Sequence, residues 1–294
     1  MHDASSPKAV LALSSHVARG SVGLRAAGFA IERLGLPLWK VPTIWLPWHP
    51  GHARRFGVPP RHAMPDEAFE ASLQALVGLP VVDEVGAILT GYFASAGQVH
   101  ATCRAIDQVR AVSPDVLVVC DPVSADAHGT YVPDGVVTAI REELLPRCDV
   151  ATPNRFELTS FAGAGELADN AALIESARAL EIDRVVVTSA FGMMKNAIGT
   201  LFVEGRTATL AEHALVPGAP HGTGDVFSAL LTAHLLMGQP IDKAVGQATA
   251  SVFEMVARSV KAGSDELLMA REQASLISPM TMVTTRHLAA ARAT

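Results

Sequence analysis

The chain has 294 residues, of which 49% are apolar and 18% charged, and its formal net charge is −6. This length buries a substantial core in one large or two small α/β domains, and without clustered Lys and Arg we expect neither nucleic-acid nor membrane-surface binding. Three cysteines without metal-ligand spacing, no signal-peptide pattern and no apolar run long enough to span a bilayer favour a cytoplasmic protein.

Strand-like and helix-like segments alternate along most of the chain. Strands are predicted at 9–16, 38–45, 87–93, 116–123, 149–154 and 184–190, and helices at 20–35, 66–78, 96–112, 134–147 and 155–181. A β-hairpin over 196–216 and three helices near 223–237, 241–260 and 264–277 complete the chain. Strands spaced by helices predict a mainly parallel sheet covered on both faces, and the absence of a linker predicts one domain over 1–294. In such sheets ligands bind beyond the carboxyl ends of the strands.

A glycine turn leads directly into the helix predicted at 223–237. It reads Gly222-Thr223-Gly224-Asp225. Unpaired amides at a helix start, together with the helix dipole, form an anion site that suits a phosphoryl group. Asp225 is therefore a candidate base that takes a proton from a substrate hydroxyl. The alternative is a tight turn followed by a helix cap, and the turn is not a Walker A loop, because no Gly-Lys-Ser/Thr follows.

Two neighbouring strand ends carry acidic and polar residues. Asp121 ends a buried strand, and Thr152 and Asn154 end the next one, with Glu157 in the first turn of the following helix. A buried carboxylate needs a partner or a cation, so Asp121 and Glu157 are candidate ligands of Mg²⁺, directly or through water. The alternative is an ordinary strand-end turn with a glutamate that complements the helix dipole.

The long loop over 46–65 is rich in Pro, Gly and His. Two histidines three residues apart, His49 and His52, are poor support for a zinc site. We interpret the loop as a flap over a pocket, because long irregular loops in compact domains are often functional.

The chain resembles the pyridoxal kinases, the vitamin B6 branch of the ribokinase superfamily, over nearly its whole length. The resemblance rests on "SSHVARGSVG", "LGLPLWKVPTIW", "LTGYFASAGQ", "CDPV", "YVPDGV", "LLPRCDVATPNRFEL", "VVVTSA" and "GTGD", in the family's order and spacing. It implies a ribokinase-like three-layer α/β sandwich, with a mostly parallel sheet between helices and no large lid domain.

The resemblance also implies an activity, its cofactors and its partners. A pyridoxal kinase moves the γ-phosphoryl group of ATP to the 5′-hydroxyl of a B6 vitamer, requires Mg²⁺, often uses a monovalent cation such as K⁺, and forms a homodimer. In this chain Asp225 matches the catalytic base of the family. Gly222, Thr223 and Gly224 match its anion hole.

Further residues match the two binding sides of the family. Asp121 and Glu157 match positions near the metal and the triphosphate. Thr152, Asn154 and Thr188 match residues on the phosphate and nucleotide side.

On the substrate side, four residues are in register with the family. Ser15 matches the serine that meets the pyridine nitrogen, Thr43 a pocket threonine, and Tyr92 the aromatic residue against the ring. His49 is the one residue that stays in register in the flap, where many relatives carry a polar Phe-Ser-Asn-His-Thr segment and this chain reads Leu46-Pro47-Trp48-His49-Pro50.

The remaining departures leave two alternative functions open. His221 precedes the glycine turn where a small or apolar residue is more usual, and the loop after Asp121 lacks the aldehyde-capturing cysteine of some bacterial relatives. The first alternative is a hydroxymethylpyrimidine kinase of thiamin synthesis. The second is a non-catalytic B6 vitamer-binding protein on the same scaffold.

Overall fold

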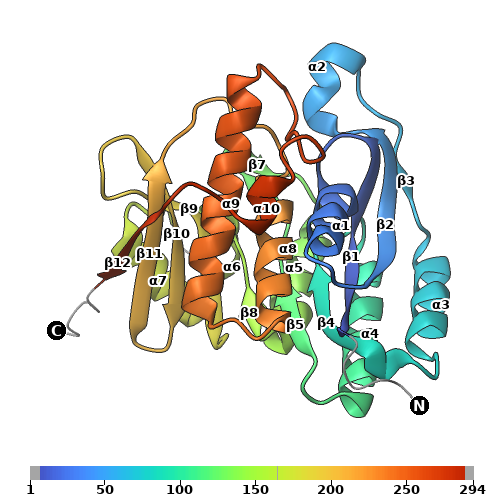
Figure 1. Cartoon of the computed structure of the whole chain (residues 1–294). Coiled ribbons are helices and arrows are strands. Elements are labelled where there is room, and N and C mark those ends of the chain that lie inside the picture. The colour runs from blue at the N-terminus through green and yellow to red at the C-terminus, as the bar shows by residue number, and fades with distance from the viewer. Residues whose placement is uncertain (1–6, 164, 289–294) are drawn as a thin grey trace.

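A ten-stranded sheet runs through the computed structural model, which describes residues 7–163 and 165–288 (Figure 1). Its strand order is β12-β11-β10-β9-β8-β5-β4-β1-β2-β3. The strands are β1 (Ala9–Arg19), β2 (Leu38–Trp48), β3 (His62–Ala63), β4 (Val85–Thr90), β5 (Leu117–Cys120), β8 (Val150–Ala151), β9 (Arg184–Phe191), β10 (Ala197–Glu204), β11 (Thr207–Ala214) and β12 (Thr284–Leu288). From β2 to β9 all neighbouring strands pair in parallel, and the strands at both edges pair antiparallel.

Helices cover both faces of the sheet, as the alternation of segments predicts. One face carries α1 (Gly23–Arg33), α8 (Thr223–Leu236), α9 (Ile241–Lys261) and α10 (Ala274–Ile277). The other face carries α3 (Asp66–Val77), α4 (Ala96–Val112), α5 (Asp134–Ala139), α6 (Arg155–Ala162) and α7 (Asn170–Ala179). Successive residues of β1 enter opposite cores: Val10 packs on the α1 side and Leu11 on the α4 side. The three-layer sandwich is therefore confirmed, and strands buried on both faces explain the continuous apolar runs in the sequence.

Short elements join these layers. They are η1 (Pro50–His52), α2 (Ala53–Phe56), η2 (Val82–Glu84), the hairpin of β6 (Ala125–Asp126) and β7 (Gly129–Thr130), a π-helical turn η3 (Ile140–Leu144) and η4 (Leu145–Arg147). No helix in the described part of the chain is both long and apolar enough to cross a membrane.

The first two strands are longer than predicted. β1 continues to Arg19 and β2 to Trp48, and the pairing of the two strands changes register between Ser14 and His16. Pro42 pairs with Ser14 at this point. Because proline has no N–H to give to the ladder, an irregularity near it follows from the sequence.

The flap, residues 46–65, has local structure of its own. It starts in β2 and then forms η1, α2 and the two-residue strand β3, which pairs with Ile44 and Trp45 of β2. Figure 1 shows α2 at the same end of the molecule as the start of α8. This places the flap at the edge of the sheet where ligands of such folds bind.

The helix predicted near 264–277 is wrong except for its last turn, α10. Gly263 has a φ of +68° and ends α9, and the chain then runs irregularly. Leu267 and Met269, two residues apart, both enter the core, which a helix does not allow on one face. Ser21 donates to the carbonyl of Leu267 at 2.8 Å and helps to fix this path.

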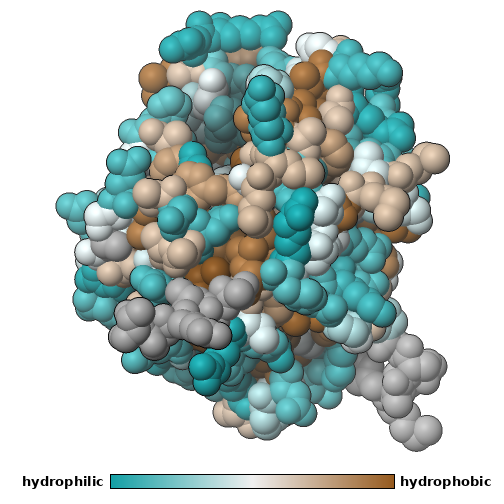
Figure 2. Space-filling view, turned by 90° about the vertical axis from the view of Figure 1, so that its left-hand side faces the viewer, coloured by the Kyte–Doolittle hydropathy of each residue, from teal (hydrophilic) through white to brown (hydrophobic). Residues whose placement is uncertain are grey.

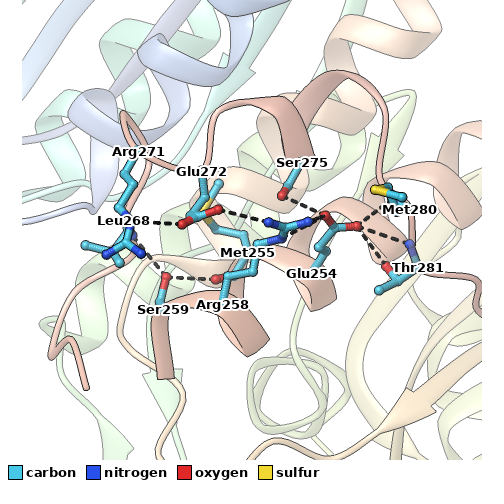
Figure 3. A network of polar contacts seen from close by, with 10 residues as sticks. All are labelled: Glu254, Met255, Arg258, Ser259, Leu268, Arg271, Glu272, Ser275, Met280 and Thr281. Carbon is cyan, nitrogen blue, oxygen red and sulfur yellow. Dashed lines mark hydrogen bonds and ion pairs between the residues drawn. The ribbon is translucent and has the colours of Figure 1, made fainter. Parts of the chain in front are cut away.

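A buried glutamate fixes the chain after α10 (Figure 3). Glu254 of α9 is 4% exposed and accepts hydrogen bonds from the amides of Met280 and Thr281 and from the hydroxyl of Ser275. Beyond this point the chain forms β12, which the sequence analysis did not predict. Figure 2 looks onto this end of the molecule and shows hydrophobic residues gathered among hydrophilic ones.

Candidate active site

Several strand ends and one helix start meet at the carboxyl edge of the parallel strands. Thr90 ends β4, Asp121 follows β5 and Thr152 follows β8, while α8 begins at Thr223 on the same edge. A narrow cavity of about 10 Å³ lies among them and is lined by Ser14, Thr90, Gly91, Asp121, Asp225 and Ser228. The topology thus brings together side chains that are more than a hundred residues apart.

The glycine turn has the backbone that an anion site needs. Gly222 is the N-cap of α8 with a φ of +95°, and no side chain caps the helix. A Cβ atom on Gly222 would lie 1.9 Å from the carbonyl oxygen of Ser21, so only glycine fits here. A Cβ on Gly224 would come within 3.9 Å of a carboxylate oxygen of Asp121, which places the turn directly beside that residue. The first amides of α8 are therefore available to an incoming anion.

Asp225 lies in the first turn of α8 and faces the narrow cavity. Burial raises the pKa of its carboxyl to about 6, although a hydrogen bond from the backbone N–H of Gly23 acts in the opposite direction. A carboxylate with this pKa is ionised at pH 7 yet can accept a proton readily.

Three carboxyl groups converge at this point. Burial raises the pKa of Asp121 well above its usual value, and the neighbouring charges of Glu157 and Asp225 raise it further. Burial also raises the pKa of Glu157 to about 8, against the lowering effect of its backbone hydrogen bonds. Carboxylates gathered in this way offer the oxygen ligands that a hard cation prefers. Among residues 7–163 and 165–288, however, no three His, Cys, Asp or Glu side chains are placed to hold a metal ion by themselves.

Asn154 and Glu157 form a capping box at the start of α6. Asn154 Oδ1 accepts from the amides of Phe156 and Glu157, and Glu157 Oε2 accepts from the amide of Asn154 at 2.7 Å. Glu157 Oε1 accepts from the amide of Ser124 at 3.0 Å. Glu157 is thus held by the protein backbone on both oxygens, which fits a water-mediated role toward a metal better than direct coordination.

Thr152 is linked to the carboxylate cluster through Ser228. The two hydroxyls lie 2.8 Å apart, and Ser228 is hydrogen-bonded in turn to Asp121. Sequence analysis missed Ser228, although it lies three residues after Asp225 and therefore on the same face of α8. It also missed Thr90, whose buried hydroxyl lines the narrow cavity without a hydrogen-bond partner among the described residues.

Two of the residues expected on the substrate side, Thr43 in the middle of β2 and Tyr92 just after β4, lie next to each other. The Thr43 hydroxyl donates to the carbonyl of Tyr92 at 2.7 Å, and the Tyr92 hydroxyl accepts from Arg61 at 2.5 Å. Gln98 of α4 donates to the carbonyl of Thr43. Ser14, rather than Ser15, lines the cavity in front of Asp225, and its hydroxyl accepts from the amide of Tyr92.

Ser15 instead lies against the start of α1. A Cβ on Gly23 would lie 2.4 Å from the Ser15 hydroxyl and 2.2 Å from its carbonyl oxygen. Ser15 therefore packs against the residue whose amide is hydrogen-bonded to Asp225.

His49 connects the flap to the glycine turn. Its ring lies 4.6 Å from that of His221, centroid to centroid, and its Nδ1 accepts from the amide of Gly51 at 3.1 Å. His52, also in the flap, lies 3.5 Å from a carboxylate oxygen of Glu266 in the loop after α9. The flap is thus closed down on the edge of the sheet that carries Asp225.

A second, larger cavity of about 140 Å³ opens on the other side of the glycine turn. Thr223, Gly224 and Thr188 line it together with apolar residues of β10, α8 and α9. Ser189, which also lines it, has a φ of +56°, at the point where β9 and β10 lose their register. Of these residues, the sequence analysis predicted Thr188. It did not predict the apolar wall, because apolar residues in strands and helices are equally expected in an ordinary core.

Comparisons with known proteins show which family the chain resembles. The family model described as phosphomethylpyrimidine kinase matches residues 55–270. The pyridoxine/pyridoxal/pyridoxamine kinase of Bordetella avium is 37% identical over 265 residues, which are 88% of each chain. Pyridoxal kinase PdxY of Rubrobacter xylanophilus is 32% identical over 292 residues, covering 95% of this chain and 97% of that protein.

A solved structure gives the same result for the fold. Pyridoxal kinase of Leishmania donovani in complex with ADP and pyridoxamine superposes with a TM-score of 0.89 at 28% identity, covering 96% of this chain and 99% of that one. The chain therefore belongs to the pyridoxal kinases, within the family described as phosphomethylpyrimidine kinase.

Proposed function

We propose that this protein phosphorylates the 5′-hydroxyl of pyridoxal or a related B6 vitamer with ATP. One observation carries the proposal: the amides at the start of α8 and the carboxylate of Asp225 lie between the two cavities. The larger cavity suits the nucleotide, and the flap side suits the alcohol. The names of the relatives, which are B6 kinases, support the same substrate class.

The protein's part in the reaction is to position the phosphoryl group and the alcohol and to neutralise the charge of the phosphates. The amides of Thr223 and Gly224 hold the γ-phosphoryl group, while Asp225 takes the proton of the substrate hydroxyl. The hydroxyl oxygen then forms a bond to phosphorus, and ADP leaves with the electrons of the bond that breaks. Little covalent chemistry is asked of the protein in such a loose transition state.

The carboxylate cluster is the proposed place for Mg²⁺. Burial raises the pKa values of Asp121 and Glu157, and neighbouring carboxylates raise them further. A cation beside them would favour their charged forms, which supports this assignment. Since Glu157 is held by backbone amides, we propose that it acts through water and that Asp121 lies closest to the ion. When bound, Mg²⁺ would neutralise charge on the phosphates during transfer.

On the substrate side, Thr43, Tyr92, Ser15 and His49 are the proposed ring contacts. The link of His49 to His221 supports a flap that closes over the alcohol and excludes water. Thr152, Asn154 and Thr188 are proposed on the phosphate and nucleotide side; Thr188 lines the larger cavity there.

A coupled ATP-consumption assay tests the function. Pyridoxal, pyridoxine, pyridoxamine and hydroxymethylpyrimidine are compared as acceptors, and the phosphorylated product is identified by mass. Turnover on at least one B6 vitamer is expected, with hydroxymethylpyrimidine a poorer substrate. Faster turnover on hydroxymethylpyrimidine would assign the protein to thiamin synthesis. Vitamer binding without any ATP consumption would favour the alternative of a non-catalytic vitamer-binding protein.

Four further properties are proposed from the family resemblance. They are a requirement for a monovalent cation such as K⁺, a homodimer, a cytoplasmic location and a single kinase domain over 1–294. Replacing K⁺ with Na⁺ in the same assay and measuring the molar mass by light scattering test the first two.

A further inference from the structure

A stacked pair of rings forms part of the wall of the larger cavity. His213, near the end of β11, and Phe253 of α9 have ring centroids 4.4 Å apart and ring planes 24° apart. Both residues line the cavity that also contains Thr223 and Gly224. The same cavity therefore offers amides for phosphates and a ring-bearing apolar wall for a planar base.

The hydrogen bond of His213 determines which of its nitrogens carries the proton. Nδ1 lies 3.0 Å from the carbonyl oxygen of Ala214. A carbonyl can only accept, so Nδ1 donates, and in the neutral ring Nε2 is left with a lone pair. Burial lowers the pKa of His213, so the ring is neutral at pH 7.

Nε2 of His213 has no hydrogen-bond partner among the described residues, and the residue that carries it lines the cavity. The other polar side chains of the cavity wall are hydroxyls of serine and threonine. A hydroxyl rotates and either donates or accepts, so it does not distinguish two bases by their polar groups. His213 is the lining side chain with a fixed acceptor.

The wall that carries Phe253 is held firmly in place. The next residue, Glu254, is the centre of the network in Figure 3, with Ser275, Met280 and Thr281 as donors. Arg258, one turn further on, bonds to Glu254 and to Glu272. Because α9 is braced on this side, the His213–Phe253 pair presents a rigid surface to the cavity.

We propose that His213 selects the base of the phosphate donor, with Nε2 accepting a hydrogen bond from the 6-amino group of adenine. Purines with a 6-oxo group present an acceptor to the same lone pair and are rejected. The proposal rests on the proposed function in one respect, namely that a purine nucleoside triphosphate occupies the larger cavity.

Three nucleotides separate this contact from stacking. ATP carries the 6-amino group, purine riboside triphosphate has only hydrogen at that position, and inosine triphosphate has the 6-oxo group. For the unmodified protein we expect kcat/KM and calorimetric affinity to be about tenfold better for ATP than for purine riboside triphosphate, and worst for inosine triphosphate. In His213→Phe, which keeps a ring against Phe253, the ATP values fall about tenfold and those of purine riboside triphosphate change less than twofold.

The matched control is His287→Phe, because His287 is an exposed residue of β12 outside the cavity wall. This substitution should leave kcat/KM and the affinity for all three nucleotides unchanged. If His213→Phe fails to fold, as judged by thermal unfolding, His213→Gln replaces it. The amide of that variant can turn to present an acceptor to ATP or a donor to inosine triphosphate. The ratio of kcat/KM for ATP to kcat/KM for inosine triphosphate should therefore fall at least fivefold, toward a value of 1.

The proposal would be overturned if the ratio of kcat/KM for ATP to kcat/KM for purine riboside triphosphate were the same in the unmodified protein and in His213→Phe. The proposed function fails separately. If no B6 vitamer is phosphorylated by any donor while the binding preference for ATP depends on His213, this inference stands and the kinase assignment falls. If vitamers are phosphorylated equally well with all three donors, the kinase assignment stands and this inference falls.

Discussion

His49 of the flap and His221, which precedes the glycine turn, lie against each other with ring centroids 4.6 Å apart and ring planes tilted by 43°. Gly51 packs against both rings, because a Cβ there would lie 2.4 Å from His221 Nε2 and 2.8 Å from His49 Nδ1. Burial, together with the nearby His221 and His52, lowers the pKa of His49 to about 4, and burial also lowers the pKa of His221, so the pair is uncharged at pH 7. The flap is therefore attached to the residue that precedes the anion site.

Replacing His221 with valine removes one ring of this pair and should loosen the flap. A contact between two such rings contributes about 0.5–1.5 kcal/mol, so we expect KM for the vitamer to rise about two- to tenfold with a smaller change in KM for ATP. Steady-state kinetics with each substrate varied in turn measure both values. His287→Val, the same change at an exposed site, is the control. An unchanged vitamer KM in His221→Val would show that the contact between these rings does not hold the flap over the substrate.

Replacing Asp225 with asparagine should remove the base and keep the shape of the site. We expect kcat to fall by about 10²–10⁴, the usual contribution of a general base, while calorimetric affinity for ATP changes little. Asp115→Asn, at an exposed position, controls for the loss of one charge. Comparable kcat values for Asp225→Asn and the unmodified protein would assign proton removal to another group.

The same substitution should stabilise the ligand-free protein. The pKa of Asp225 is raised to about 6, so the folded state favours its protonated form and stability is lost as pH rises from about 4 through 6. Above that range Asp225→Asn should be more stable by up to about 3 kcal/mol, and at pH 4 the two proteins should differ little. Urea unfolding at several pH values measures this difference. A gain that is independent of pH would contradict the raised pKa.

The sequence predicts much of this fold because its signals are local. Apolar runs and helical spacing predict the alternation of strands and helices, and α4 (Ala96–Val112) has the predicted bounds. The motif residues Asp121, Thr152 and Asp225 are brought to one edge because parallel strands all end there.

The missed features depend on packing between distant segments. Nothing near Ser228 in the chain indicates that its hydroxyl will meet Thr152, 76 residues away. The composition of the segment after Gly263 predicts a helix. The segment is irregular instead, and Leu267 within it is buried in the core. β12 pairs with β11, and its Arg286 is ion-paired with Glu212, 74 residues away in the chain.

The buried carboxylate of Glu254 should make an acid-sensitive contribution to stability. Burial opposes its charge, but the hydrogen bonds from the amides of Thr281 and Met280, from Ser275 and from Arg258 together outweigh burial and lower its pKa. Its contribution is therefore present above the unfolded pKa of about 4.5 and is lost as pH falls through the lower folded value. At pH 7, Glu254→Gln should cost about 2–3 kcal/mol, since the new amide cannot accept all of these bonds. Urea unfolding at pH 7 and pH 3 measures the contribution, and Glu175→Gln at an exposed position is the control. An equal loss at both pH values would contradict the lowered pKa.

Gly222→Ala should damage the anion site more than the fold. The new methyl group would meet the carbonyl oxygen of Ser21 at 1.9 Å in a backbone with a φ of +95°, so the turn must move. Because a displacement of about 1 Å at a reacting group reduces turnover about 10²-fold, we expect a loss of at least that size in kcat. Gly246→Ala is the matched control: its Cβ has open space in α9, and alanine there should raise stability by up to about 1 kcal/mol without affecting kcat. Turnover and thermal unfolding of both variants are compared. If Gly222→Ala turns over at the normal rate, the amides of this turn do not hold the transferred phosphoryl group, and the role of Asp225 beside them loses its basis.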